Sequence, residues 1–325
     1  MVPAARKMHT ALHTVQKFRI SKGIPILQEV DPNQTGLIGA EFTPITTTLG
    51  NLEAKQTSLN PDFAALLVLW FSQLELQPGD RVGMQFSGSF PALCIAAIIA
   101  AEELQIVPVI SSSIGASSFG ANLPELTYPD IEKFLLQEGI INHGSTFVTP
   151  GGNEDNGSSF WQGGDSIAMQ AAERNGYSLT IPNSLRESIQ HKLKFFRENG
   201  EIKAFVNIGG NQSAIGNCPH SPVLPVGLVR SHPACHDSLR GLLMYSFEEK
   251  IPVIHLLNIR SVAAENGIHL TPYPLPEPGK SRVYYKIRNS KPVIIGALIL
   301  LFAAIFFSHP RLPQTFFRQN NIHQH

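Results

Sequence analysis

Two serines stand where one apolar run passes into the next, Ser87 and Ser89 in the stretch QFSGSFPALCIAAIIAAEE at 85–103. A serine at a strand-to-helix turn can be a nucleophile, and the usual pattern requires small residues two places before and two places after it. Around Ser87 these places hold Gln85 and Ser89, and around Ser89 they hold Ser87 and Pro91. The pattern is therefore absent. We expect Ser89 to cap the following helix instead, with Pro91 in its first turn.

Three further segments combine glycine with small polar residues after a predicted strand, at 111–122, 149–157 and 207–216. Glycine lets the backbone approach a ligand, and free N–H groups at helix starts favour phosphate or carboxylate. One such loop is more often an ordinary turn. Several on one sheet edge predict a site for an anionic ligand. The predicted ligand-binding residues are Ser87, Gly88, Ser89, Ser113, Gly115, Ser117, Asn122, Gly151, Gly152, Asn207, Gly209 and Gly210.

A catalytic site at the same edge is an alternative. Its candidates are Ser87 or Ser89 as nucleophile, assisted by His255 or Asp155. His255 ends a predicted strand and could act there as an acid or base, although a hydrogen-bonded core histidine is the favoured interpretation. Lys55 lies in the Thr- and Gly-rich segment before the first strand. It either meets a carboxylate or phosphate or is a solvated surface lysine.

Other site classes find little support. Cysteine and histidine gather between Cys218 and Asp237, but the long gap after Cys-x-His is unlike a zinc site, so no metal ligand is predicted. No phosphate loop with Gly-Lys-Ser/Thr occurs, and no particular cofactor is indicated. The formal net charge of zero disfavours a nucleic-acid partner. The three cysteines are too few for a disulfide framework and favour a reducing compartment.

The elements that would position these residues alternate in type along the chain. Short apolar runs predict strands at 81–86, 105–111, 145–149, 203–209 and 251–257. Helical patterns lie at 61–76, 90–104, 128–137, 164–174, 184–198 and 237–249. The alternation predicts an α/β fold, with an open, mostly parallel, Rossmann-like sheet and helices on both faces. The carboxyl ends of parallel strands meet at one edge, which would bring the loops together.

The C-terminal part has a different composition. Residues 292–308, PVIIGALILLFAAIFFS, carry no charge and predict a transmembrane helix at the lower length limit; a buried helix of a soluble domain is the alternative. More basic residues precede this segment than follow it, which predicts a membrane protein whose large domain faces the cytoplasm. The predicted organisation is an N-terminal helix and Thr/Gly-rich segment at 1–60 packed on the main domain, an α/β domain at 61–270, a Pro-rich and basic linker at 271–291, the span at 292–308 and a polar tail at 309–325.

Five stretches taken together resemble a known family. They are DPNQTGLIGAEFTPITTTLGNLEAKQTSLNPDFAALLV, GDRVGMQFSGSFPAL, SSSIGASSFGAN, FVNIGGNQSAIG and IPVIHLLNI. They resemble the poly-gamma-glutamate system protein family from about Ala4 to near Gly279. The resemblance implies an accessory role in bacterial poly-gamma-glutamate synthesis or export, with the synthase and export proteins as partners and a membrane setting. It implies no reaction and no catalytic residue. Family members tend to have an N-terminal membrane segment, whereas the apolar segment here lies at the other end.

Three functions are compatible with these features. The first is a membrane-anchored accessory protein, attached to the lipid bilayer through 292–308, that binds glutamate, its polymer or a phosphate-bearing precursor at the strand-end loops. The second is an amide hydrolase or transferase acting on gamma-glutamyl bonds. The third is a scaffold of the synthase complex in which the loops are only turns. Convergence of the loops at 87–89, 113–117, 151–155 and 207–211 on one pocket would favour binding.

Overall fold

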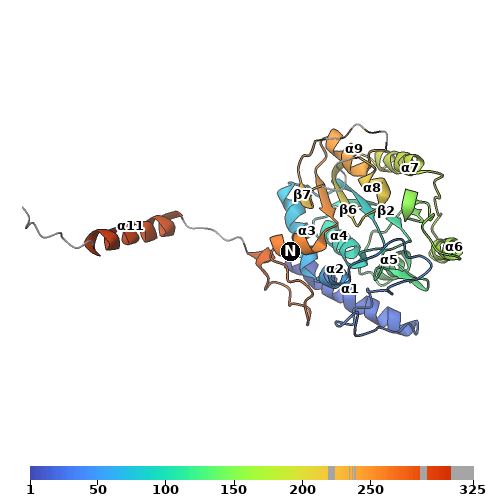
Figure 1. The fold of residues 1–325 in the computed structure, drawn as a ribbon, viewed down its shortest axis with the longest axis horizontal. Helices are drawn as coiled ribbons and strands as arrows, with labels where there is room; N and C mark the ends of the chain where they lie inside the picture. Colours follow the sequence, from blue (N-terminus) through green and yellow to red (C-terminus); the bar gives the residue numbers. More distant parts are fainter. Residues whose placement is uncertain (219–223, 234, 236, 238, 286–290, 309–325) are drawn as a thin grey trace, which may run out of the picture. The chain divides into compact units, whose positions relative to one another are not determined.

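Six strands form the central sheet of the computed structural model, which describes residues 1–218, 224–233, 235, 237, 239–285 and 291–308 (Figure 1). The strand order is β5-β2-β1-β6-β8-β7, and every neighbouring pair is parallel except β7 with β8. The strands are β1 Arg81–Phe86, β2 Val107–Ser113, β5 Phe147–Thr149, β6 Ile202–Ile208, β7 Gly227–Val229 and β8 Val253–Leu256. The predicted α/β fold with a mostly parallel sheet is confirmed. The antiparallel edge strand β7 was not predicted, and neither was the small hairpin of β3 Asn122–Leu123 and β4 Leu126–Thr127.

Helices cover both faces of the sheet. Met84 and Val206, neighbours across β1 and β6, point into the larger apolar core with α1, α3 and α4, whereas Phe205 and Val253 point into a second core with α7 and α9. Figure 1 shows α7 and α9 on one side of the strands and α1 on the other. The helices are α1 Val2–Ser21, α2 Leu52–Ser58, α3 Asp62–Gln73, α4 Pro91–Glu103, α5 Tyr128–Gln137, α6 Gly164–Arg174, α7 Leu185–Glu198, α8 Gln212–Ile215, α9 Leu242–Glu248, α10 Ile259–Glu265 and α11 Lys291–Ser308.

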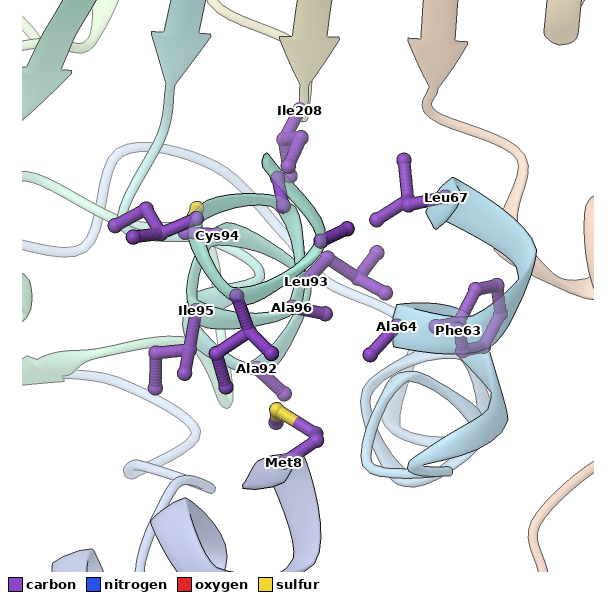
Figure 2. Close-up of a cluster of buried hydrophobic side chains, with 14 of the residues drawn as sticks. Met8, Phe63, Ala64, Leu67, Ala92, Leu93, Cys94, Ile95, Ala96 and Ile208 are labelled. Atoms are coloured by element: carbon purple, nitrogen blue, oxygen red, sulfur yellow. The ribbon is translucent and has the colours of Figure 1, made fainter. Parts of the chain in front are cut away.

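Helix α4 is the most deeply buried helix of the larger core. Its residues from Pro91 to Ala101 are all buried, and the helix is apolar on every side. A helix without a polar face must be covered all round. In Figure 2, Met8 of α1 and Phe63 of α3 lie on two sides of α4, and Ile208 at the end of β6 lies on another. Helix α4 therefore forms a middle layer between the sheet and the outer helices α1 and α3.

The first compact unit of the chain, Met1–Tyr284, ends later than the boundary predicted at 270. The Tyr284 hydroxyl donates to Asp62 Oδ1 at 2.5 Å, and Val283 is buried in the larger core, so the end of the Pro-rich stretch is packed rather than extended. The N-terminal helix packs on the α/β core as expected. Residues 286–290 of the predicted linker and the predicted tail at 309–325 lie outside the described residues.

The second unit, Tyr285–His325, contains the apolar helix α11. Within the part of the chain that the structure describes, no helix combines the length and the hydropathy needed to cross a membrane. The transmembrane span predicted at 292–308 is therefore not supported.

A disulfide joins Cys218 and Cys235, whose Cα atoms are 6.3 Å apart. The cysteines are too few for a disulfide framework, and their pattern did not predict this single bond. The two cysteines are 17 residues apart, and their spacing alone did not reveal the bond. Because disulfides persist mainly in oxidising compartments, the cysteine count no longer supports a reducing one. Cys94 is a free, buried cysteine in α4.

Truncation of a buried side chain of α4 tests whether this helix forms the middle layer of the larger core. Leu93→Ala removes a fully buried side chain and leaves a cavity between layers that cannot close up, so we expect the free energy of unfolding to fall by about 2–5 kcal/mol. Urea unfolding followed by circular dichroism measures the change. Leu270→Ala, at a leucine that is 42% exposed, is the matched control and should cost less than about 1 kcal/mol. Equal losses in the two variants would contradict a core centred on α4.

Candidate functional site

The loops after five strands open into one pocket at the carboxyl edge of the sheet. Its volume is about 690 Å³. Segment 47–51, which precedes the first strand, forms another part of its wall. The structure therefore brings the predicted loops together. The predicted ligand-binding residues that line this pocket are Ser87, Ser89, Ser113, Gly115, Ser117, Gly152 and Gly210.

The other predicted residues hold the loops in place without lining the pocket. Asn122 Nδ2 donates to the Ala40 carbonyl at 2.8 Å and to Thr46 Oγ1 at 2.9 Å. Both of its N–H groups therefore join two loops of the protein. Gly151 has φ +83°, and a Cβ there would come within 2.8 Å of the Ser113 Cβ atom. These residues shape the wall and do not face the cavity. They are Gly88, Asn122, Gly151, Asn207 and Gly209.

His255, a candidate acid or base, lies in the sheet and not on the pocket wall. Its side chain is 2% exposed, and its Nδ1 lies 3.0 Å from Asn207 Nδ2. Asn207 also donates to the Gly209 carbonyl at 2.9 Å. Burial lowers the pKa of His255 to about 4, so the imidazole is neutral at neutral pH. The arrangement fits a hydrogen-bonded core histidine that links β8 to the loop after β6.

Asp155, the other predicted assistant, is fully buried and fully bonded. Its carboxylate pairs with Lys192 Nζ at 2.5 Å and accepts hydrogen bonds from Ser188 Oγ, Thr149 Oγ1 and Asn211 Nδ2 at 2.6, 2.9 and 3.0 Å. Burial lowers the pKa of Lys192, and the Asp155 charge opposes that shift. Neither Asp155 nor His255 is hydrogen-bonded to Ser87 or Ser89. Asp155 instead ties α7 to the loops after β5 and β6.

The two serines after β1 bond to each other and to the next loop. Ser87 Oγ donates to Ser89 Oγ at 2.9 Å, and the backbone N–H of Ser117 donates to Ser89 Oγ at 3.0 Å. The expectation that Ser89 caps α4 is wrong, because Phe90 holds the N-cap position and no side chain caps the helix. The Ser89 hydroxyl is instead engaged by the loop after β2.

Lys55, on α2, is the buried cation of the pocket wall. Its side chain is 3% exposed, so the alternative of a solvated surface lysine is wrong. Nζ donates to the Ser89 carbonyl at 2.5 Å, lies 2.7 Å from Ser117 Oγ and stands 3.9 Å from the centre of the Phe90 ring. No carboxylate of the described residues lies within 4.0 Å of Nζ. Burial lowers the pKa of Lys55 to about 7, so the ammonium and the neutral amine are similarly populated at neutral pH.

One part of the pocket wall and one contact within it were not predicted. Residues 257–260 follow β8 and line the pocket, and Arg260 among them pairs with Glu53 at 3.1 Å. Both side chains are more than half exposed, so this pair leaves Arg260 accessible at the rim. The rule that placed the other loops also applies to the strand predicted at 251–257 and could have found this one. The contact of Lys55 with Ser117 joins residues 62 apart in sequence and has no local signal.

The sequence predicts no metal site between Cys218 and Asp237, and the structure describes only part of this segment. Cys218 and Cys235 are joined to each other, so neither offers a thiolate to a metal. Among the residues with described positions, no group of three or more His, Cys, Asp or Glu side chains is arranged to hold an ion. His220 and His236 lie outside the described residues.

Comparison with known proteins finds no family model, no curated protein and no solved structure that matches this chain. The family resemblance therefore stays a prediction from the five sequence stretches.

The buried Asp155–Lys192 pair provides a test of how the loops are held. Asp155→Ala leaves the Lys192 ammonium buried without a partner, and we expect a loss of about 3–5 kcal/mol in the free energy of unfolding. Replacing both residues, Asp155→Leu with Lys192→Met, should cost less than the single change because no charge is left unpaired. Urea unfolding measures all three proteins.

The control for this test is the exposed pair Lys194–Glu198 on the same helix. Lys194→Ala should change the stability by less than about 0.5 kcal/mol. A double variant that is as unstable as Asp155→Ala would show that the loss comes from packing and not from the buried charge.

Proposed function

We propose that this protein binds an anionic ligand in the pocket at the carboxyl edge of its sheet. The observation that carries the proposal is Lys55, a buried amine on the pocket wall without a carboxylate partner among the described residues. Buried charges in proteins are normally paired, and a ligand carboxylate or phosphate would complete this one. Arg260 at the rim adds a second, accessible cation.

The rest of the wall suits an oxygen-rich ligand. Hydroxyl groups of Ser113, Ser159 and Thr47 and amide groups of Asn51 and Asn211 surround the cavity. Such groups donate to carboxylate or phosphate oxygens without adding opposing charge. A scaffold in which the loops were only turns would not need this concentration of donors around one cavity. The convergence of the loops therefore favours binding over the scaffold alternative.

The sequence resemblance supports a pathway for this ligand. Resemblance to poly-gamma-glutamate system proteins favours glutamate, its polymer or a phosphate-bearing precursor, and synthase and export proteins as partners. Attachment to a bilayer through 292–308, with the large domain facing the cytoplasm, belongs to the same proposal and rests on the sequence alone. Deletion of the gene, followed by measurement of polymer amount, length and release, tests the pathway.

Titration calorimetry of the full-length protein with glutamate, oligo-gamma-glutamate and inorganic phosphate tests the binding itself. We expect at least one of these probes to bind. Lys55→Met removes the buried charge and should weaken that binding about tenfold or more, because a hydrogen bond to a charged group contributes about 1.5–3 kcal/mol. Lys194→Met, at an exposed lysine, should leave the affinity unchanged. The absence of heat with all three probes would remove the proposal.

The pH dependence of glutamate or oligo-gamma-glutamate binding provides a separate prediction. The side-chain carboxylates keep their charge above about pH 5.5, whereas Lys55 loses its proton as the pH rises through about 7. The affinity should therefore be constant below pH 7 and fall at higher pH, by at most about tenfold per pH unit. The profile of Lys55→Met should be flat over the same range. A flat profile in the parent protein would show that Lys55 does not supply the charge.

A further inference from the structure

We propose that Ser117 and Lys55 form a nucleophile and general base that cleave the acyl bond of an amide or ester carrying a negative charge. The negative charge of the substrate rests on the proposed function above, while the chemistry rests on a different contact. Lys55 Nζ lies 2.7 Å from Ser117 Oγ, within reach of a direct proton transfer. Both residues line the pocket, so a bound carbonyl group can approach the serine oxygen.

The surroundings of Lys55 orient its lone pair. A neutral amine has two N–H groups and one lone pair. The Ser89 carbonyl, 2.5 Å from Nζ, accepts one N–H, and the face of the Phe90 ring, 3.9 Å away at its centre, accepts the other. The third neighbour is Ser117 Oγ, to which the Lys55 ammonium donates its remaining N–H. In the neutral amine that position holds the lone pair, and the bond reverses so that the serine hydroxyl donates to Nζ.

The serines after β1 position this pair. The Ser117 N–H donates to Ser89 Oγ, and Ser87 Oγ donates to the same atom. Because the Ser89 hydroxyl accepts both bonds, its own hydrogen remains for a ligand oxygen on the pocket side. Ser87 and Ser89 are thus positioning residues for Ser117, and the nucleophile is on the neighbouring loop.

The reaction that this geometry allows is a two-step acyl transfer to water. In the first step the Ser117 hydroxyl proton moves to Lys55 Nζ, Oγ bonds to the substrate carbonyl carbon, and the bond to the amine or alcohol breaks as the Lys55 ammonium returns the proton to the leaving group. In the second step water gives a proton to Lys55 and its oxygen attacks the ester carbon. Ser117 Oγ then leaves and takes that proton back. The net change is hydrolysis of one acyl bond, with no oxidant or metal required.

The acidity of Lys55 suits this role. A general base works best when its pKa lies near the operating pH, and burial brings the pKa of Lys55 to about 7. The ammonium form produced by the first proton transfer is also the form that attracts an anion. Before that transfer, Arg260 and the wall hydroxyls hold the negative group of the substrate.

A serine-directed fluorophosphonate probe, applied to the full-length protein and followed by peptide mass mapping, tests the assignment. We expect one adduct, on Ser117, and its loss in Ser117→Ala. The control is Ser118→Ala at the adjacent buried serine, which does not line the pocket and should be labelled as the parent is. The labelling rate should rise with pH through about 7 and then level off, because the neutral amine is the base. An adduct on Ser87 or Ser89, or a rate that is independent of pH, would overturn the proposal.

Two replacements of Lys55 separate the chemistry from binding. Lys55→Met should weaken glutamate binding about tenfold or more, as expected above, and should also abolish labelling. Lys55→Arg keeps a cation but cannot accept a proton near neutral pH, so it should retain binding while labelling falls about a hundredfold or more. Thermal melting of each variant checks its fold, and the pH profile of the parent protein provides an answer even where a variant does not fold. If the parent protein binds glutamate but is not labelled, only the serine–lysine pair is refuted. If the parent protein is labelled but binds none of the anions, only the proposed function is refuted.

The charge of the substrate is tested with two activated esters, the singly charged p-nitrophenyl glutarate and the neutral p-nitrophenyl acetate. We expect the anionic ester to acylate Ser117 about tenfold faster or more. Release of p-nitrophenolate is followed by absorbance, and the release with Ser117→Ala is subtracted for each ester because the glutarate carboxylate also expels p-nitrophenolate by forming its own cyclic anhydride. Equal rates for the two esters would overturn the anionic substrate class.

Discussion

The complete burial of α4 is the constraint on which the rest of this structure depends. The helix has no polar face, so the sheet must cover one side and α1 and α3 the others. This requirement places the N-terminal helix against the core although it lies far from α4 in the sequence. It also fixes the start of α4, and with it the short turn after β1 that reaches the pocket. The geometry of the site therefore depends on the apolar packing around α4.

Two buried lysines meet the same electrostatic problem in different ways. Lys192 is paired with Asp155 and donates to the Ser213 hydroxyl, which is the usual arrangement for a charge removed from water. Lys55 has a carbonyl, a hydroxyl and an aromatic ring but no described carboxylate. Its pKa is lowered mainly by burial, and no described carboxylate opposes that shift. Lys192 holds loops together. Lys55 has no carboxylate partner among the described residues, so it can bind an anionic ligand or accept a proton.

Most of the sheet could be predicted because buried parallel strands leave apolar runs that can be read locally. The common edge followed from topology, and the small polar loops at that edge were found by the same reasoning. What could not be predicted depends on contacts between distant residues. The packing of separate segments decides whether the Asn122 amide faces the pocket or the Ala40 carbonyl. It also decides whether the Lys55 amine lies in water or against Ser117. The antiparallel β7 is too short for a periodic pattern, and the Cys218–Cys235 bond joins residues whose spacing carries no local signal.

The segment before the sheet contributes one wall of the pocket and is hydrogen-bonded mainly to the loop after β2. Thr46 bridges to Ala116, and the Thr47 N–H donates to the Ala116 carbonyl, while residues 48–51 continue along the cavity. The strand ends and the loops after them form most of the pocket wall. Residues 47–51, which belong to no strand, cover the pocket. Evolution could therefore alter the size or chemistry of the accepted molecule by changing a few residues in the cover, while the apolar layers that determine folding stay as they are.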